Sequence, residues 1–305
     1  MIDATEFRAV YRSAAVYDGV LLPHFFVGFE DADLVARLMH QHYGPPDGAC
    51  DLSIVDLGCG TGRVTSRLQP YAGSLLAVDS SQSMIATFRA LHRDADTWCV
   101  DIRDGVGRLL TEGRAGTFDV VGAFWSLSYP ISECFEEVTA DGVRQVSDHA
   151  VARERAGRLV GDIVSLVAPK GHLLVLYFDP GTREQRLVTR LWERIAKFPY
   201  DRRAHTRQLL IDELRAAEDR GEGWLTYSRL GGVAMAPDRE AARAWFDHLH
   251  LKDVPALVND PEVQQMIEQF VEECVQPSGQ VAIPSGVYVM DFHAAPEAEA
   301  HLPAR

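Results

Sequence analysis

The sequence lacks several features that would assign it to particular classes of protein. Its longest apolar runs, such as residues 173–178, are far shorter than the roughly 20 residues that a membrane-spanning helix needs. The N-terminal residues do not place a basic stretch before an apolar one, as a secretory signal does. The five cysteines are odd in number, and no two have the spacing of a zinc or redox pair. We therefore expect a cytoplasmic protein with reduced thiols, no membrane partner and no metal.

Positive charge is also in short supply. Lysine is scarce, and 44 acidic residues against 30 basic ones give a net charge of -14. Nucleic-acid binding relies on Lys and Arg to neutralise phosphates, and the nearest approach to a basic patch is the short pair Arg202 and Arg203. We therefore expect no nucleic-acid partner, but a small-molecule substrate that is neutral or cationic. A monomer and a homodimer are both compatible with these features.

Short apolar runs alternate with amphipathic segments between residues 50 and 180. Continuous apolar strands separated by helices predict a parallel sheet covered on both faces. The expected fold is therefore α/β, a doubly wound and mostly parallel sheet with helices on both faces. The predicted strands of this region cover residues 53–58, 74–79, 97–101, 118–125 and 168–178.

The alternation lapses after the fifth strand. Residues 181–220 look helical, and residues 224–236 predict a hairpin around Gly231 and Gly232. Ligands of open α/β sheets bind beyond the carboxyl ends of the strands, so an insertion here predicts a cap that selects the substrate. The predicted parts are an N-terminal helical lid (1–45), a core (46–180), the cap (181–236), C-terminal helices with a last strand that completes the core (237–294) and a disordered tail (295–305).

A glycine-rich turn, in the stretch IVDLGCGTGR, follows the first of these strands. A dinucleotide fingerprint that starts at Gly58 would place its third glycine at position 63, which is Arg63, and this argues against a nicotinamide reductase. The phosphate-binding pattern G-x-x-x-x-G-K-[ST] is also absent. Asp56, near the strand end, would repel a pyrophosphate and suits a cation such as an amino group. The turn is therefore a different loop from these two nucleotide-binding patterns.

VDLGCGTGR closely resembles the first motif of the class I S-adenosylmethionine (SAM)-dependent methyltransferases of the small-molecule or natural-product type. Asp79 ends the second strand, where that family has an acid that binds the ribose hydroxyls. Asp101 and Ile102 follow the third strand, where the family has an acid near the adenine amine and an apolar residue on the ring. FDVVGAFWSLSY (118–129) resembles the fourth motif, and LVAPKGHLLV (166–175) is similar to the entry to the fifth strand, with Lys170 in place of a glycine.

The resemblance covers about residues 50–180, and residues 11–18 are similar to a helix that closes over the cofactor in many relatives. It implies a Rossmann-like sheet of seven strands, with SAM as cofactor and S-adenosylhomocysteine as product. The cofactor contacts that it implies are Tyr11, Tyr17, Asp56, Gly58, Cys59, Gly60, Asp79, Ser80, Met84, Asp101, Ile102, Phe124 and Trp125.

Methyl transfer from a sulfonium needs mainly proximity and in-line orientation, whereas a hydroxyl or carbon acceptor needs a base. The candidate bases are His24, His205 and Asp179. His248 and His250 lie two residues apart on a predicted helix and so face different ways, which argues against a metal site there. The candidate substrate contacts are Tyr129, Tyr177, Tyr200 and Arg207, together with Arg183.

These features predict a SAM-dependent methyltransferase that modifies a nitrogen, an oxygen or a carbon of a small specialised metabolite. Two alternatives stay open. One is a methyltransferase for protein or tRNA, which a basic rim on the cap would favour. The other is a module of the same fold that binds SAM without transferring its methyl group.

Overall fold

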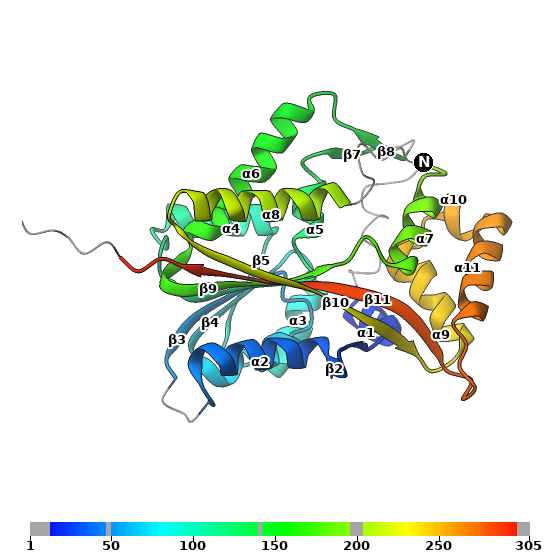
Figure 1. Ribbon diagram of the computed structural model, residues 1–305, viewed down its shortest axis with the longest axis horizontal. Helices are drawn as coiled ribbons and strands as arrows, with labels where there is room; N and C mark the ends of the chain where they lie inside the picture. The colour runs from blue at the N-terminus through cyan, green and yellow to red at the C-terminus, as the bar shows by residue number, and fades with distance from the viewer. Residues whose placement is uncertain (1–12, 47–49, 140–141, 196–203, 298–305) are drawn as a thin grey trace, which may run out of the picture.

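A nine-stranded sheet, in the order β2-β1-β10-β11-β9-β6-β3-β4-β5, forms the centre of the protein. The computed structural model describes residues 13–46, 50–139, 142–195 and 204–297 (Figure 1). Five neighbouring strands are parallel, and β11 runs antiparallel to both of its neighbours. The parallel strands are β3 (Leu52–Leu57), β4 (Ala72–Asp79), β5 (Asp96–Cys99), β6 (Phe118–Phe124) and β9 (Val167–Phe178).

The prediction of an α/β sheet with a parallel core is confirmed, but the number of strands is nine and not seven. The two additional strands, β1 (His24–Phe26) and β2 (Phe29–Glu30), come from the N-terminal segment that was predicted to be only helical. β1 pairs antiparallel with the edge of β10, so it covers hydrogen-bonding groups that would otherwise be exposed. A separate two-stranded sheet joins β7 (Glu136–Thr139) to β8 (Gly142–Gln145).

Helices cover both faces of the sheet, as predicted (Figure 1). α2 (Asp31–Tyr43) and α3 (Gln82–Leu91) lie on one face, and α4 (Ile102–Thr111), α6 (His149–Ser165) and α8 (Ala204–Asp219) lie on the other. Side chains that cap the first turns set several starts: Ser81 accepts from Met84 N at α3, and Asp101 accepts from Arg103 N at α4. The short α5 (Ser128–Ser132) follows β6. Within the described part of the chain, none of the helices is both long and apolar enough to cross a membrane.

The segment from residue 223 to residue 236 is one continuous strand, so the predicted hairpin is wrong. β10 (Gly223–Ala236) pairs along its whole length with β11 (Val281–Ala294). The reason lies in Gly232, where a Cβ atom would come within 2.1 Å of the carbonyl oxygen of Phe25. That glycine permits the close approach of β1, and it makes no turn.

The predicted cap is also divided differently. α8 packs on α6, and Leu209, Leu210 and Leu214 belong to the main hydrophobic core. Because α8 and β10 build the core and the sheet, they do not form a separate cap. Among the described elements of the predicted segment, α7 (Arg183–Trp192) lies elsewhere.

α7 belongs to a second hydrophobic cluster, which we call the helical unit. The unit surrounds the far parts of β10 and β11, which continue past the end of β9 (Figure 1). The helices predicted to complete the core after residue 237 pack here as well. With α7, its elements are α9 (Arg239–Ala244), the π-helical turn η4 (Trp245–His250), α10 (Pro255–Val258) and α11 (Pro261–Glu273).

Candidate functional site

The glycine turn follows β3 at the carboxyl edge of the parallel strands. Gly58 N and Cys59 N both donate to the carbonyl of Val78, at 2.7 and 3.1 Å, so the turn is tied to the end of β4. Gly58, Gly60 and Gly62 all have positive φ, of 84°, 55° and 92°. This backbone conformation favours glycine, and the turn could not keep its course with larger residues.

The three glycines meet different surroundings. A Cβ atom at Gly58 would lie 2.4 Å from Cβ of Ser126, and one at Gly62 would lie 2.5 Å from Nε2 of His92. A Cβ atom at Gly60 would meet nothing within 4 Å. Gly58 and Gly62 are therefore required for packing, whereas Gly60 presents bare backbone to open space where a ligand can approach closely.

Asp79 is held beside this open space by two backbone donors. Gly60 N donates to Oδ2 at 2.9 Å, and Ser81 N donates to Oδ1 at 2.8 Å. These two bonds, one to each carboxylate oxygen, fix the orientation of the group. Its orientation at the end of β4 fits the pair of ribose hydroxyls that the resemblance implies.

Asp56 lies beneath the turn and is 1 % exposed. Thr65 Oγ1 donates to its Oδ2 at 2.5 Å, but its Oδ1 is buried and has no hydrogen-bond partner among the described residues. Burial raises the pKa of Asp56 to about 7, the bond from Thr65 opposes that rise, and the nearby charge of Asp79 adds to it. An acceptor without a donor is costly inside a protein, so a cationic ligand above the turn would complement this carboxylate.

The other predicted cofactor residues lie around the same edge. Asp101 and Ile102 stand at the start of α4, where Arg103 forms an ion pair with Asp101 at 3.3 Å. Phe124 ends β6 and is buried. Met84 and Cys59 are buried, and Ser80 is exposed after β4. Burial raises the pKa of the Cys59 thiol well above its usual value, so this cysteine is no nucleophile.

The N-terminal helix α1 (Ala14–Val20) lies against the glycine turn and α3. Thr61 Oγ1, within the turn, donates to Oδ1 of Asp18 at 3.0 Å, and Ala14 N donates to Oγ of Ser83 at 2.9 Å. Tyr17 is on the same helix, and burial raises its pKa. The lid over the cofactor stays a prediction, and Tyr11 lies outside the described residues.

A buried charge cluster that the sequence did not predict joins α2 to the glycine turn. Arg63, directly after Gly62, donates from both terminal nitrogens to Asp31, at 2.5 and 2.6 Å. Trp125 Nε1 donates to Oδ2 of Asp31 at 2.8 Å. Burial opposes the ionisation of Asp31, but the bonds from Arg63 outweigh it and lower its pKa. Asp31 therefore fixes the orientation of Trp125, which has a φ of 63° in the left-handed region.

His24 lies in an aromatic environment beside this cluster. Its ring centroid is 5.7 Å from that of Trp125 and 5.3 Å from that of Trp245, in the helical unit. Nδ1 lies 2.8 Å from the carbonyl oxygen of Leu22, which can only accept, so in the neutral ring Nδ1 carries the proton and Nε2 keeps the lone pair. Burial lowers the pKa of His24, so the ring is neutral near pH 7.

The helical unit contributes a second buried carboxylate. Glu184 accepts from Trp245 Nε1 and lies 2.8 Å from Nε2 of His250. Burial opposes its ionisation, but the contact with His250 outweighs it and lowers the pKa of Glu184. Lys252 is buried, and its Nζ lies 4.3 Å from the centroid of the Tyr129 ring. Tyr129, predicted to contact substrate, therefore lies where the helical unit meets the segment after β6.

Two of the predicted functional residues are corrected by their contacts. Both carboxylate oxygens of Asp179 are occupied, by Arg229 Nε at 2.6 Å and by Gly181 N at 2.9 Å, so it is a structural ion-pair partner and no base. Tyr177 is 1 % exposed in the main core, and its hydroxyl donates to Thr206 at 2.7 Å, which leaves no surface for a substrate.

Two other candidates lie on α8. Arg207 donates to the hydroxyl of Tyr288 at 2.9 Å, and the ring of His205 lies 5.1 Å from that of Phe135. Both side chains are thus placed in the layer that α8 forms on the sheet. Tyr200 lies outside the described residues.

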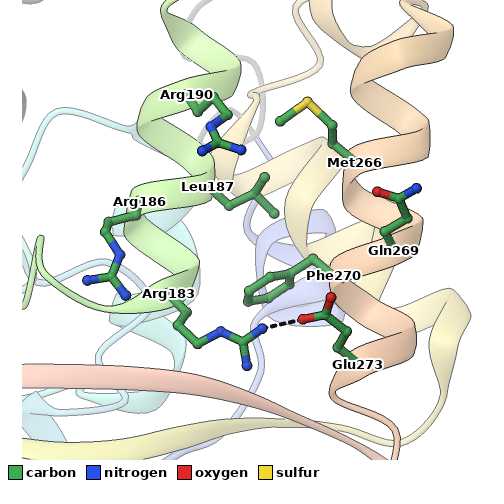
Figure 2. Close-up of a pocket in the computed structure, with 8 residues that line it drawn as sticks. All are labelled: Arg183, Arg186, Leu187, Arg190, Met266, Gln269, Phe270 and Glu273. Atoms are coloured by element: carbon green, nitrogen blue, oxygen red, sulfur yellow. Dashed lines mark hydrogen bonds and ion pairs between the residues drawn. The ribbon is translucent and has the colours of Figure 1, made fainter.

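A groove of about 320 Å³ lies between α7 and α11, on the outer side of the helical unit (Figure 2). Arg183, Arg186 and Arg190 project from α7, and Arg183 pairs with Glu273 of α11. Arg183 was a candidate for substrate contact. It is exposed at this groove, whereas its neighbour Glu184 is buried.

Comparison with known proteins agrees with the geometry of the turn. Residues 54–171 match the family described as "Methyltransferase domain". No curated protein sequence matches the chain.

Three solved structures share low identity with the chain. The YcgJ protein from Bacillus subtilis is 12 % identical over 87 % of this chain and 100 % of its own, with a TM-score of 0.45. The [4+2]-cyclase SpnF is 16 % identical over 95 % and 93 %, with a TM-score of 0.46. The plantazolicin methyltransferase BpumL, in complex with SAH, is 13 % identical over 86 % and 84 %, with a TM-score of 0.40. Likeness at these scores carries no argument about function.

The family match starts within β3 and spans the glycine turn, Asp79, Asp101 and the segment after β6. These are the positions that lie together at the carboxyl edge of the parallel strands, with Gly60 open to a ligand and Asp79 pre-oriented. Residues 54–171 of this chain therefore match a methyltransferase-domain family, and the geometry at this edge of the sheet agrees with that match.

Proposed function

We propose that the protein transfers the methyl group of SAM to a nitrogen or an oxygen of a small organic acceptor. The observation that carries the proposal is the open backbone at Gly60 beside the carboxylate of Asp79, which Gly60 N holds at 2.9 Å. The residues present fit SAM: Asp79 would hold the ribose, and Asp101 with Ile102 would hold the adenine. The orphaned oxygen of Asp56 would face the positive charge of the cofactor.

SAM supplies a methyl group that is already activated by a sulfonium leaving group, so the chain has mainly to orient and to shield the acceptor. The aromatic rings of Trp125, Trp245 and Tyr129 border the region next to the turn. Flat apolar walls of this kind suit an aromatic or otherwise organic acceptor. The net charge of -14 adds to the preference for a neutral or cationic molecule over a nucleic acid.

His24 is the proposed general base. The carbonyl of Leu22 fixes the tautomer with the proton on Nδ1, so Nε2 is the basic nitrogen, and burial keeps the ring neutral. A hydroxyl or an ammonium acceptor must lose a proton before or during attack, and Nε2 would take it. Asp31 acts through Trp125, whose ring it orients beside His24, and is a positioning residue.

Calorimetry with SAM and, separately, with S-adenosylhomocysteine is the first test of the proposal. We expect both to bind, with the demethylated product at least as tight as SAM. Labelled SAM is then offered with a panel of phenols and amines, using Asp79→Ala as the control that should neither bind nor transfer. Failure of both ligands to bind would refute the cofactor site. Tight binding without transfer to any acceptor would instead favour a module that binds SAM without methylating.

A further inference from the structure

A second group of chemically competent side chains lies at the opposite edge of the sheet. His172 is near the start of the paired part of β9, Asp291 is near the end of β11, and His42 is in the last turn of α2. His172 pairs with His293 across β9 and β11, and Asp291 is two residues before His293. The side chains of His172, His293 and Asp291 therefore share one face of the sheet. This is the amino edge of the parallel strands, whereas the glycine turn lies at the carboxyl edge.

The contacts within this group are short. His172 Nδ1 lies 2.8 Å from Oδ1 of Asp291, and His42 Nε2 lies 2.7 Å from Oδ2 of the same carboxylate. One possible ligand atom from each of the three residues lies within 4.8 Å of the other two. His172 and Asp291 are buried, and the His42 side chain is only 15 % exposed. The two imidazoles and the carboxylate therefore form a compact, mostly dry cluster.

One nitrogen of the cluster has no donor or acceptor in line with it. His42 Nε2 is close to the carboxylate, but it is out of line for a hydrogen bond and is buried without a hydrogen-bond partner among the described residues. A buried polar atom usually has a partner, and an orphan calls for an explanation such as an ion. The stacking of His42 on His172, with centroids 3.8 Å apart, keeps both rings beside the same carboxylate.

We propose that His42, His172 and Asp291 bind a divalent transition-metal ion, with zinc as the expected occupant. Two imidazoles and one carboxylate are ligands that such ions prefer, and three protein ligands leave one position of a tetrahedral site to water. The ion joins α2, β9 and β11, three elements that are distant in sequence. It lies outside the methyl-transfer site and does not depend on the proposed function.

The bound ion ties the end of α2 to the sheet, so it should raise the melting temperature. At a metal concentration about 100 times the dissociation constant, an increase of about 5 °C is expected for a chain of this size.

The test is a titration of the full chain with Co²⁺, after removal of metals with a chelator and without a histidine tag. We expect one equivalent of Co²⁺ to bind, with the visible absorption of a four-coordinate site, and Zn²⁺ to displace it. His172→Gln should weaken binding at least about 100-fold, because even lost supporting contacts cost 10–100-fold at such sites. His40→Gln, on the exposed side of α2, is the matched control and should bind like the parent protein.

Several results would overturn the proposal. The first is a parent protein that binds no Co²⁺ or Zn²⁺. The second is undiminished binding in both His172→Gln and Asp291→Asn, and the Asn variant serves alone if the Gln variant does not fold. The third is a near-ultraviolet sulfur-to-cobalt band, which would assign the ion to cysteine thiolates.

Discussion

Ionisation of Asp56 should make the protein without cofactor less stable as the pH rises. Its pKa is about 7 in the folded protein, against an ordinary value of 3.8. A carboxyl whose pKa is raised by folding favours the folded state at low pH, and this contribution is lost as the pH rises through the folded pKa. Between pH 5 and pH 8, these two values give a loss of about 2 to 3 kcal/mol from this group alone.

The perturbation is Asp56→Asn, which cannot ionise and can still accept a hydrogen bond from Thr65. Denaturant unfolding at pH 5, 6.5 and 8 compares the parent protein with this variant, and Asp94→Asn, at an exposed position, is the matched control. Between pH 5 and pH 8, we expect the free energy of unfolding of Asp56→Asn to fall by about 2 to 3 kcal/mol less than that of the parent protein. Equal slopes in the parent and in Asp56→Asn would refute the reasoning.

The same carboxyl links protons to cofactor binding. With a pKa of about 7, Asp56 is about half protonated at pH 7, and the positive charge of bound SAM would favour its ionised form. Calorimetry at pH 7 in buffers of different ionisation enthalpy should therefore report release of up to about half a proton per SAM. No release in the parent protein would mean that the charge of SAM lies too far from Asp56.

Four more variants test the site. Asp79→Ala should weaken SAM binding by about 1.5–3 kcal/mol, the usual value of hydrogen bonds to a charged group, and an unchanged affinity in calorimetry would contradict the ribose assignment. Gly58→Ala should lower the melting temperature, because its Cβ atom would overlap Ser126. Gly60→Ala should cost only the strain of its positive φ, about 1 kcal/mol of stability, yet weaken SAM binding. A lower melting temperature for Gly60→Ala than for Gly58→Ala would count against this view of the turn. His24→Gln should reduce kcat by about 10²–10⁴-fold for a hydroxyl acceptor. It should also remove the acidic limb of the pH–rate profile, which reflects the lowered pKa of His24 in the parent enzyme. An unchanged profile would exclude His24 as the base.

The sequence predicted the parts of the site that depend on short stretches of chain. Gly58 and Asp79 each follow directly on an apolar strand, and parallel strands bring their carboxyl ends to one edge. Their placement therefore needed only the order of strands. The buried cluster of Asp31, Arg63 and Trp125 depends instead on residues that are 32 and 94 positions apart. Asp31 looked like an ordinary residue at a helix start, and Arg63 was informative only as a residue that is not glycine.

The wrong predictions share a physical cause. Gly231 and Gly232 are typical of a turn in a local pattern, but Gly232 is a point of contact between strands. Tyr177 stands near the end of a strand, as a substrate contact would, but β9 is buried on both faces and takes it into the core. In both cases a neighbour that is remote in sequence decides the role of the residue, so local spacing could not reveal it.

The pairing of β10 and β11 has a consequence for how the site exchanges its ligands. The two strands stay in register from the pair Gly223 and Ala294 to the pair Ala236 and Val281, and the helical unit is built around their far part. The helical unit is thus attached to the sheet through two strands that pair without a break. We therefore expect ligand exchange to depend on α1, which polar contacts from Asp18 and Ala14 hold to the glycine turn and α3. Replacing the helices of the helical unit would then alter acceptor choice, while the rate of turnover would depend on the N-terminal helix α1.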